Sequence, residues 1–216
     1  MSIDDLKFAL YLAVALLPSL VLHEFAHALA ADRLGDPTPR RWGRLTLNPR
    51  PLVDPFGTII LPALVLLLVA AGKGFILPIF AYAKPTPLDA NYLRNRGRDS
   101  LVIVLAGPGA NLVLGAVAGT LMRTGITGDA QLVAYAFLLV NVFMFVFQLM
   151  PVPGLDGAKL LARVLPPRPR DVYVTLDQYL VLFMLVIFFL LAGPLLGIVR
   201  ALAGAMCSVL AGSPIC

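Results

Sequence analysis

The stretch His23-Glu24-Phe25-Ala26-His27 lies inside an apolar run from Phe8 to Ala31. A run of this length predicts a membrane-spanning helix over residues 7–31. Positions i and i+4 of a helix share a face, so His23 and His27 point the same way, as two ligands of one metal ion must. Glu24 lies beside them, where it could act as a general base toward a water molecule. Because ionisable side chains are costly to place inside hydrocarbon, this cluster indicates a functional site.

The composition indicates an integral membrane protein. The chain has 216 residues, of which 59% are hydrophobic and 13% charged, and its mean hydropathy is +0.88. A soluble domain carries roughly 25% charged residues. The net charge of +5 comes from basic residues in short loops between apolar runs. It is therefore not a nucleic-acid signature, and the expected surroundings are a lipid bilayer.

The apolar runs predict an all-α, polytopic helix bundle with about five spanning helices. After the first helix, the runs of helical length cover residues 57–71, 101–122, 130–150 and 176–199. The run 75–83 is too short to span as a helix and predicts a re-entrant or extended segment. Within the basic loop 32–56, the alternation of residues 44–47 predicts a short strand. We expect one domain over residues 1–216, with its core at about 7–165 and a C-terminal helix and tail at 176–216.

The distribution of basic residues predicts the topology. Most of the 17 Lys and Arg residues lie in three loops, 32–56, 84–100 and 158–175. If segment 75–83 returns the chain across the bilayer, these loops share one side, and the positive-inside rule places that side in the cytosol. The N-terminus is then outside, and the His23–His27 site lies nearer the cytosolic face.

A catalytic zinc ion usually has three protein ligands and one open position. His23 and His27 are the only histidines, and both cysteines, Cys207 and Cys216, lie in the C-terminal tail. Asp156 is the best candidate for the third ligand, because it follows a helix in the break Pro151–Gly157, where irregular backbone must line a cavity or be buried in protein. The alternative is that Asp156 caps the helix that follows it. The two cysteines could form a disulfide or remain inert thiols.

Other polar and small residues leave alternatives open. Asn111 is a lone amide in an apolar helix and could form an interhelical hydrogen bond or belong to the site. Two small-xxx-small patterns, Gly115–Gly119 and Gly193–Gly197, could pack within the chain or between chains, so an oligomer is compatible with the sequence.

Three motifs in order resemble the site-2 protease family of intramembrane zinc metalloproteases, peptidase family M50. They are the H-E-x-x-H at residues 23–27, the G-P-x-x-N at 107–111 and the P-x-P-x-x-D-G at 151–157. The stretch 83–87, Ala-Lys-Pro-Thr-Pro, is also similar to bacterial members, and the resemblance covers roughly residues 15–165. The chain resembles a minimal, prokaryotic form of these membrane proteases, without a PDZ insert or a nucleotide-sensing region.

The resemblance implies that His23, His27 and Asp156 bind one zinc ion and that Glu24 activates water. It also implies that the substrates are membrane proteins cut within their transmembrane helices. Gln148 stands where the family commonly has an Asn associated with the substrate or the developing oxyanion. Gln148 and Asn111 are therefore the candidates for substrate or oxyanion contacts.

Two other functions are compatible with the same ligands. A membrane metal-binding or transport protein should carry polar residues spaced along a path through the bilayer, whereas here they cluster at one depth. A pseudo-protease would hold membrane helices without cutting them. The intact Glu24 argues against it, and the replacement at Gln148 keeps it open.

Overall fold

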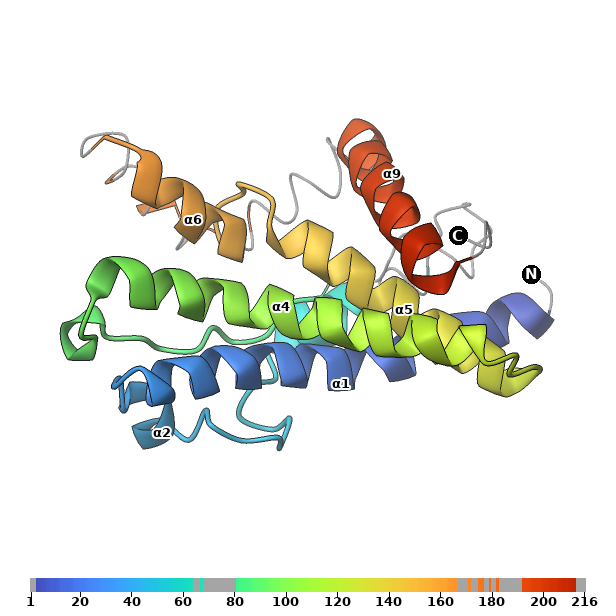
Figure 1. Cartoon of the computed structure of the whole chain (residues 1–216), viewed down its shortest axis with the longest axis horizontal. Coiled ribbons are helices and arrows are strands. Elements are labelled where there is room, and N and C mark those ends of the chain that lie inside the picture. Colours follow the sequence, from blue (N-terminus) through green and yellow to red (C-terminus); the bar gives the residue numbers. More distant parts are fainter. Residues whose placement is uncertain are drawn as a thin grey trace.

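The computed structural model describes residues 3–63, 81–166 and 192–212, together with the isolated positions 67, 171, 175, 176, 179 and 182. Three long helices form its centre: α1 (Ile3–Arg33), α4 (Arg96–Arg123) and α5 (Asp129–Gln148). They run lengthwise through the molecule in Figure 1, and α4 packs against both α1 and α5. All three are long and apolar enough to cross a membrane. The chain is thus a helical membrane protein.

The ends of the long helices follow local chemistry. At the start of α4, the Asn95 side chain accepts from the Arg98 amide, while the Asp99 carboxylate accepts from the Asn95 amide. These two bonds satisfy backbone donors that the helix itself leaves free. Helix α1 ends before Gly35, whose φ of 106° suits a residue without a Cβ.

Shorter elements surround the three long helices. They are α2 (Thr38–Arg41), the π-helical turn η1 (Pro55–Ile60), the 3₁₀ turn η2 (Ala90–Tyr92), α6 (Asp156–Val164) and α9 (Ala192–Ala211). Helix α6 contacts α4, whereas α9 contacts α4 and α5. In Figure 1, α6 lies above the left end of the central helices and α9 above their right half.

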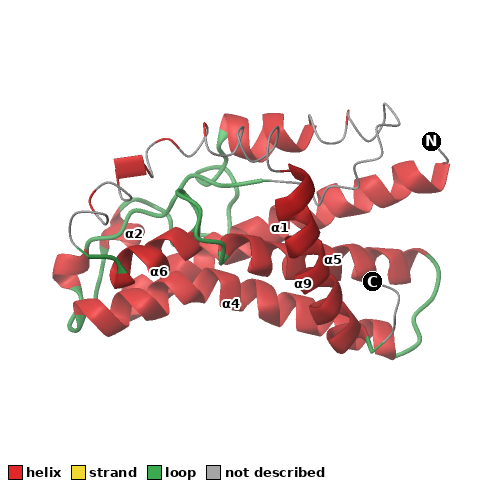
Figure 2. Ribbon diagram, turned by 90° about the horizontal axis from the view of Figure 1, so that it is seen from above, coloured by secondary structure: helices red, strands yellow, loops and turns green. Residues whose placement is uncertain are grey.

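The prediction of a short strand at residues 44–47 is wrong. Residues 45–47 form a bend, and the described part of the chain is drawn in Figure 2 as helices and loops alone. The reason is local hydrogen bonding: the Arg44 amide donates to the Pro39 carbonyl, and the Thr46 amide donates to the carbonyl of Arg44. The Arg44 guanidinium also donates to the Pro51 carbonyl, which folds the segment onto itself. A strand needs a ladder partner, and these backbone groups are already used within the loop.

The expected helices at 101–122 and 130–150 correspond to α4 and α5, and the expected helix at 7–31 corresponds to α1. Of the predicted span 57–71, residues 57–63 and 67 are described and are helical, and the others lie outside the described residues. Most of the predicted span 176–199 also lies outside them, as does 75–80 of the predicted return segment. Residues 81–83 are described and are not helical. Cys216 also lies beyond the described part, so the alternative between a disulfide and two thiols stays a prediction.

The glycine pattern at 115–119 packs within the chain. A Cβ at Gly115 would lie 3.3 Å from the Val142 side chain of α5, and a Cβ at Gly119 would lie 2.9 Å from the Leu210 backbone of α9. By contrast, a Cβ at Gly197 would meet no atom of the described residues within 4 Å. The first pattern therefore lets α4 approach its neighbours closely.

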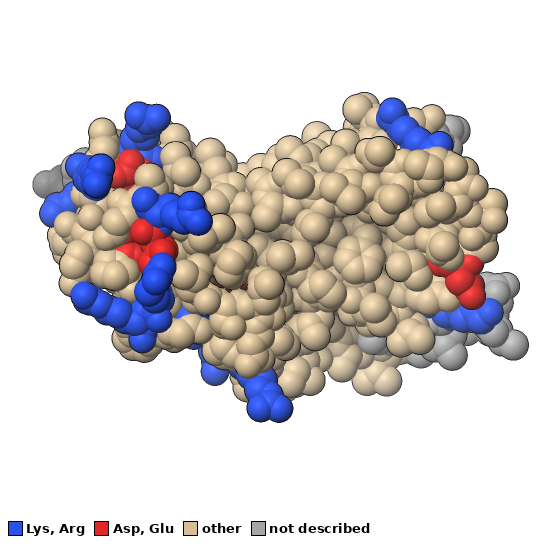
Figure 3. Space-filling model, turned by 60° about the horizontal axis from the view of Figure 1, so that its bottom comes forward, with Lys and Arg blue, Asp and Glu red and all other residues tan. Residues whose placement is uncertain are grey.

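Charge is unevenly distributed along the molecule. Figure 3 shows Lys and Arg side chains gathered at one end, with a broad uncharged surface across the middle. At this end Arg40 forms an ion pair with Asp32, and the Arg163 guanidinium donates to the Gly97 carbonyl. The basic end is therefore where α1 finishes, α4 begins and α6 lies.

Candidate metal centre

Helix α1 supplies three of the buried ionisable side chains at the site. His23 and His27 are one helical turn apart, and their Nε2 atoms lie 3.1 Å from each other. Their exposed fractions are 1% and 5%, and Glu24 beside them is 8% exposed. The i, i+4 spacing thus places both imidazoles on one face of α1, as predicted.

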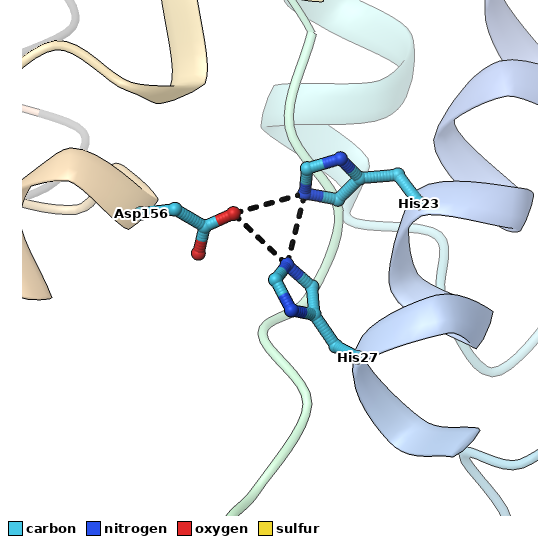
Figure 4. Close-up of side chains that lie close together, drawn as sticks. All are labelled: His23, His27 and Asp156. Atoms are coloured by element: carbon cyan, nitrogen blue, oxygen red, sulfur yellow. Dashed lines mark hydrogen bonds and ion pairs between the residues drawn. The ribbon is translucent and has the colours of Figure 1, made fainter. Parts of the chain in front are cut away.

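Asp156 reaches the same point from another element. It is the first residue of α6, after the helix break, and its Oδ2 atom lies 2.9 Å from His27 Nε2 and 3.2 Å from His23 Nε2 (Figure 4). The alternative that Asp156 caps α6 is wrong, because the N-cap position is held by Leu155 and no side-chain capping bond is made there. The carboxylate instead faces the two histidines.

The three ligand atoms fit a small tetrahedral cation. Zinc bonds of about 2.0–2.1 Å to nitrogen and oxygen place neighbouring tetrahedral ligands about 3.3 Å apart. The three edges of the observed triangle are 2.9, 3.1 and 3.2 Å. Two imidazoles and one carboxylate are also a donor set that zinc accepts in catalytic sites. These three residues therefore fit a zinc ion. Three protein ligands leave one tetrahedral position for a further ligand.

The second nitrogen of each imidazole is held by a buried partner. His27 Nδ1 donates to the Ile103 carbonyl at 2.7 Å, and His23 Nδ1 lies 2.5 Å from Asn111 Oδ1. A carbonyl can only accept, so the proton of the neutral His27 ring is on Nδ1 and its Nε2 lone pair faces the other two ligands. Such outer contacts orient metal-binding histidines.

Gly107 of α4 leaves the space that the two imidazoles occupy. A Cβ at this position would lie 2.2 Å from His27 Nε2 and 2.7 Å from His23 Nε2. Even alanine would therefore collide with the ligand atoms. The first glycine of the G-P-x-x-N motif is thus a steric requirement of the site.

Glu24 and Gln148 line one cleft with the three candidate ligands. The Thr86 hydroxyl donates to Glu24 Oε2 at 2.9 Å, and Lys159 Nζ donates to Asp156 Oδ1 at 2.9 Å. Lys159 thereby occupies one carboxylate oxygen while the other faces the histidines. Asn111 is fully buried behind His23 and is not among the residues that line the cleft.

One wall of the cleft, formed by Tyr82 and Ala83, is attached to η1 and to the loop that precedes it. The Tyr82 amide donates to the Gly57 carbonyl, and the Lys84 amide donates to the Leu52 carbonyl.

Sequence reasoning missed Gly107, Thr86 and Lys159 as individual contributors. The sequence did contain a signal for Gly107, because this residue is the first of the motif that ends at Asn111. Lys159 follows Asp156 by three residues, a spacing that brings two side chains of a helix together. Thr86 lies in an irregular segment without periodicity, so nothing in the sequence marks its contact with Glu24.

Together, the fold and the site define a helical membrane protein with a candidate metal centre and the H-E-x-x-H motif typical of zinc proteases. The chain is 32% identical over 188 residues to "Putative zinc metalloprotease YwhC" of Bacillus subtilis (strain 168), which covers 82% of this chain and 80% of that protein. It is 36% identical over 170 residues to "Putative zinc metalloprotease Rip2" of Mycolicibacterium smegmatis, covering 76% of this chain and 60% of that protein. The Rip2 protein of Mycobacterium tuberculosis (strain H37Rv) is 35% identical over 175 residues, with 80% and 64% covered.

The chain therefore belongs to the zinc metalloprotease family that contains YwhC. No protein-family model matches the chain. No solved structure matches it either.

Proposed function

We propose that the chain is an intramembrane zinc metalloprotease of the site-2 type, family M50. It hydrolyses peptide bonds within transmembrane segments of other membrane proteins. The observation that carries this proposal is the triangle of His23, His27 and Asp156, with Glu24 lining the same cleft. The three ligand residues would hold a zinc ion, which when bound would polarise the reacting carbonyl and water as a Lewis acid.

Glu24 is the proton carrier. Its carboxylate takes a proton from the attacking water, whose oxygen adds to the peptide carbonyl carbon. When the carbon–nitrogen bond breaks, Glu24 passes that proton to the leaving amine, so the carboxylate is regenerated. The Thr86 hydroxyl bonds Oε2 of Glu24 and orients the carboxylate toward the cleft.

Lys159 and Gln148 are the other two side chains of the cleft to which we give a role. Lys159 holds Asp156 Oδ1, which leaves Oδ2 for the metal. Gln148 lines the cleft and has an amide that can donate to a substrate carbonyl or to the developing oxyanion. We assign Asn111 a hydrogen bond to His23 and no contact with the substrate, because its side chain lies behind the His23 ring.

The substrate class follows from where the site lies. His23 and His27 belong to the candidate span Lys7–Arg33, near its C-terminal end, so a substrate must enter membrane depth. A helical substrate has its carbonyls in backbone hydrogen bonds and must unwind before it can be attacked. We therefore expect preferred substrates to carry helix-weakening residues near the cut bond.

The basic end of the molecule supports an orientation with the N-terminus outside and the site nearer the cytosol. His27 is closer to the basic end of α1 than to its start. The positive-inside rule places this end in the cytosol. Reporter enzymes that are active on only one side of the membrane, fused to the N-terminus, check the assignment.

The test is cleavage of a panel of tagged single-span membrane proteins co-expressed with the wild type or with Glu24→Gln. A product made by the wild type alone supports the proposal, and its terminal sequence gives the depth of the cut. Zinc binding without cleavage of any panel member would favour the helix-binding pseudo-protease. Transport of zinc into proteoliposomes would favour the metal-transport alternative.

A further inference from the structure

A chain of buried polar side chains, one hydroxyl and two amides, runs from the centre of the helix bundle to His23. It consists of Ser19 on α1, Asn141 on α5 and Asn111 on α4, each with an exposed fraction of 0%. Asn141 Nδ2 lies 2.8 Å from Ser19 Oγ, and Asn111 Nδ2 lies 2.9 Å from Asn141 Oδ1. Asn111 Oδ1 then lies 2.5 Å from His23 Nδ1. We name Ser19, Asn141 and Asn111 the amide relay.

The direction of every bond in the relay is fixed by two backbone carbonyls. The Ser19 hydroxyl donates to the Ala15 carbonyl at 2.7 Å, so its oxygen is left to accept from Asn141. Asn141 Nδ2 also donates to the Phe137 carbonyl at 2.8 Å. Because carbonyls cannot donate, the Asn141 nitrogen must face Phe137 and Ser19, and its oxygen must face Asn111.

The same logic continues to the imidazole. The Asn111 Nδ2–H must donate to Asn141 Oδ1, which turns the Asn111 oxygen toward His23. An oxygen there requires a proton on His23 Nδ1, so the neutral ring presents the Nε2 lone pair to His27 and Asp156. A flipped Asn111 would present N–H groups to Nδ1 and favour the opposite tautomer, with a proton on the ligand nitrogen.

We propose that Asn111 and Asn141 are positioning residues that hold His23 in the Nδ1–H tautomer, so that Nε2 is free to bind the metal. The inference rests on the proposed function of the site as a zinc centre. Asn111 acts directly on the ring, whereas Asn141 acts by preventing Asn111 from flipping. His27 reaches the same tautomer through one backbone carbonyl and needs no relay.

The experiment uses the fact that the chain has only two histidines. Full-length protein labelled with ¹⁵N-histidine, in detergent micelles, should give two imidazole spin systems. We expect both wild-type rings to show protonated Nδ1, with and without zinc. A neutral wild-type His23 ring in the zinc-free protein, with its single proton on Nε2, would overturn the inference without any variant, and cleavage is not needed for this readout.

Two variants then measure the effect on the metal. Asn111→Leu removes the acceptor, and Asn141→Leu leaves Asn111 free to flip. We expect zinc affinity, measured by chelator competition, to fall about 10- to 100-fold in Asn111→Leu and less in Asn141→Leu. In both, only the His23 spectrum should change, while His27 reports that the fold is intact.

Met144→Leu is the matched control. The Met144 sulfur also accepts from Asn111 Nδ2, at 3.7 Å, but a thioether is a weak acceptor and contributes far less to the orientation of Asn111 than the Asn141 oxygen at 2.9 Å. This variant should keep the tautomer and the zinc affinity of the wild type. An Asn111→Leu protein that binds zinc as tightly as the wild type, with His23 still protonated at Nδ1, would overturn the proposal. Failure of the proteolytic function would appear separately, as tight zinc binding without cleavage.

Discussion

The cleft has two corners that are built differently. In the metal corner, His23, His27 and Asp156 are each held by a further partner, and all three are nearly inaccessible. In the water corner, Glu24 meets Thr86, which lies in a segment without helical structure. The metal corner thus rests mainly on packed helices, and the water corner depends on a loop. We infer that metal binding and turnover can be separated by mutation, and the following changes test that separation.

Asp156→Ala should give the largest effect, because it removes one of three ligands. Zinc content after purification should fall to background, and cleavage should fall with it. Glu24, which lies on α1 in the other corner, is untouched by this change. Metal analysis of purified wild type and variant measures the first effect, and helix content measured by circular dichroism controls for folding.

Gly107→Ala should lower the zinc content by a comparable amount, through steric collision alone. The new Cβ would collide with both Nε2 atoms, although alanine favours the helix by about 1 kcal/mol over glycine. Gly109→Ala is the matched control two residues away, because a Cβ there meets nothing within 4 Å. Equal zinc content in the two variants would contradict the steric account.

Glu24→Gln should break the water corner alone. The amide keeps the shape of the side chain but cannot take a proton, so the rate of cleavage should fall by about 10²- to 10⁴-fold. Zinc content should stay at the wild-type level. Single-turnover cleavage measured beside metal analysis on the same samples gives both values, and loss of zinc would show that the corners are not separable.

Lys159→Met should weaken the metal corner by a smaller amount. Without the ammonium, Asp156 loses the partner of Oδ1, and zinc affinity should fall about tenfold, at the lower end of the usual effect of outer contacts. Lys159→Arg keeps the charge and should retain most of the affinity. Chelator competition measures both, and unchanged affinity in Lys159→Met would remove Lys159 from the support of Asp156.

Thr86→Val should give the smallest effect and act on the water corner. The loss of one hydrogen bond to a charged group costs about 1.5 kcal/mol or more, which corresponds to roughly a tenfold lower cleavage rate. Thr86→Ser keeps the hydroxyl and should stay near the wild-type rate. Zinc affinity should be unchanged in both. A Thr86→Val enzyme with the wild-type rate would show that Glu24 needs no support from this segment.

The sequence predicted the metal corner better than the water corner, for physical reasons. The spacing of His23 and His27 fixes their common face as soon as α1 is a helix. The direction of Asn111 depends on the rotation of α4 against α1, which periodicity leaves open, so its bond to His23 had to be observed. Thr86 belongs to an irregular segment whose course depends on contacts with residues 52–57.

The error at residues 44–47 has a similar cause. The alternation of Arg44-Leu45-Thr46-Leu47 is typical of a strand, but a strand is stable only with a partner. The Arg44 side chain and the local turns supply hydrogen bonds within the loop instead. Long apolar helices carry their hydrogen bonds internally, which is why α1, α4 and α5 could be predicted and the loop could not.

The most direct test of the account is zinc-dependent cleavage by purified protein in proteoliposomes with one tagged single-span substrate. The account predicts cutting by the wild type after chelation and reloading with zinc, no cutting before reloading, and almost none by zinc-loaded Glu24→Gln. Cutting by the chelated wild type, or equal cutting by Glu24→Gln, would contradict it.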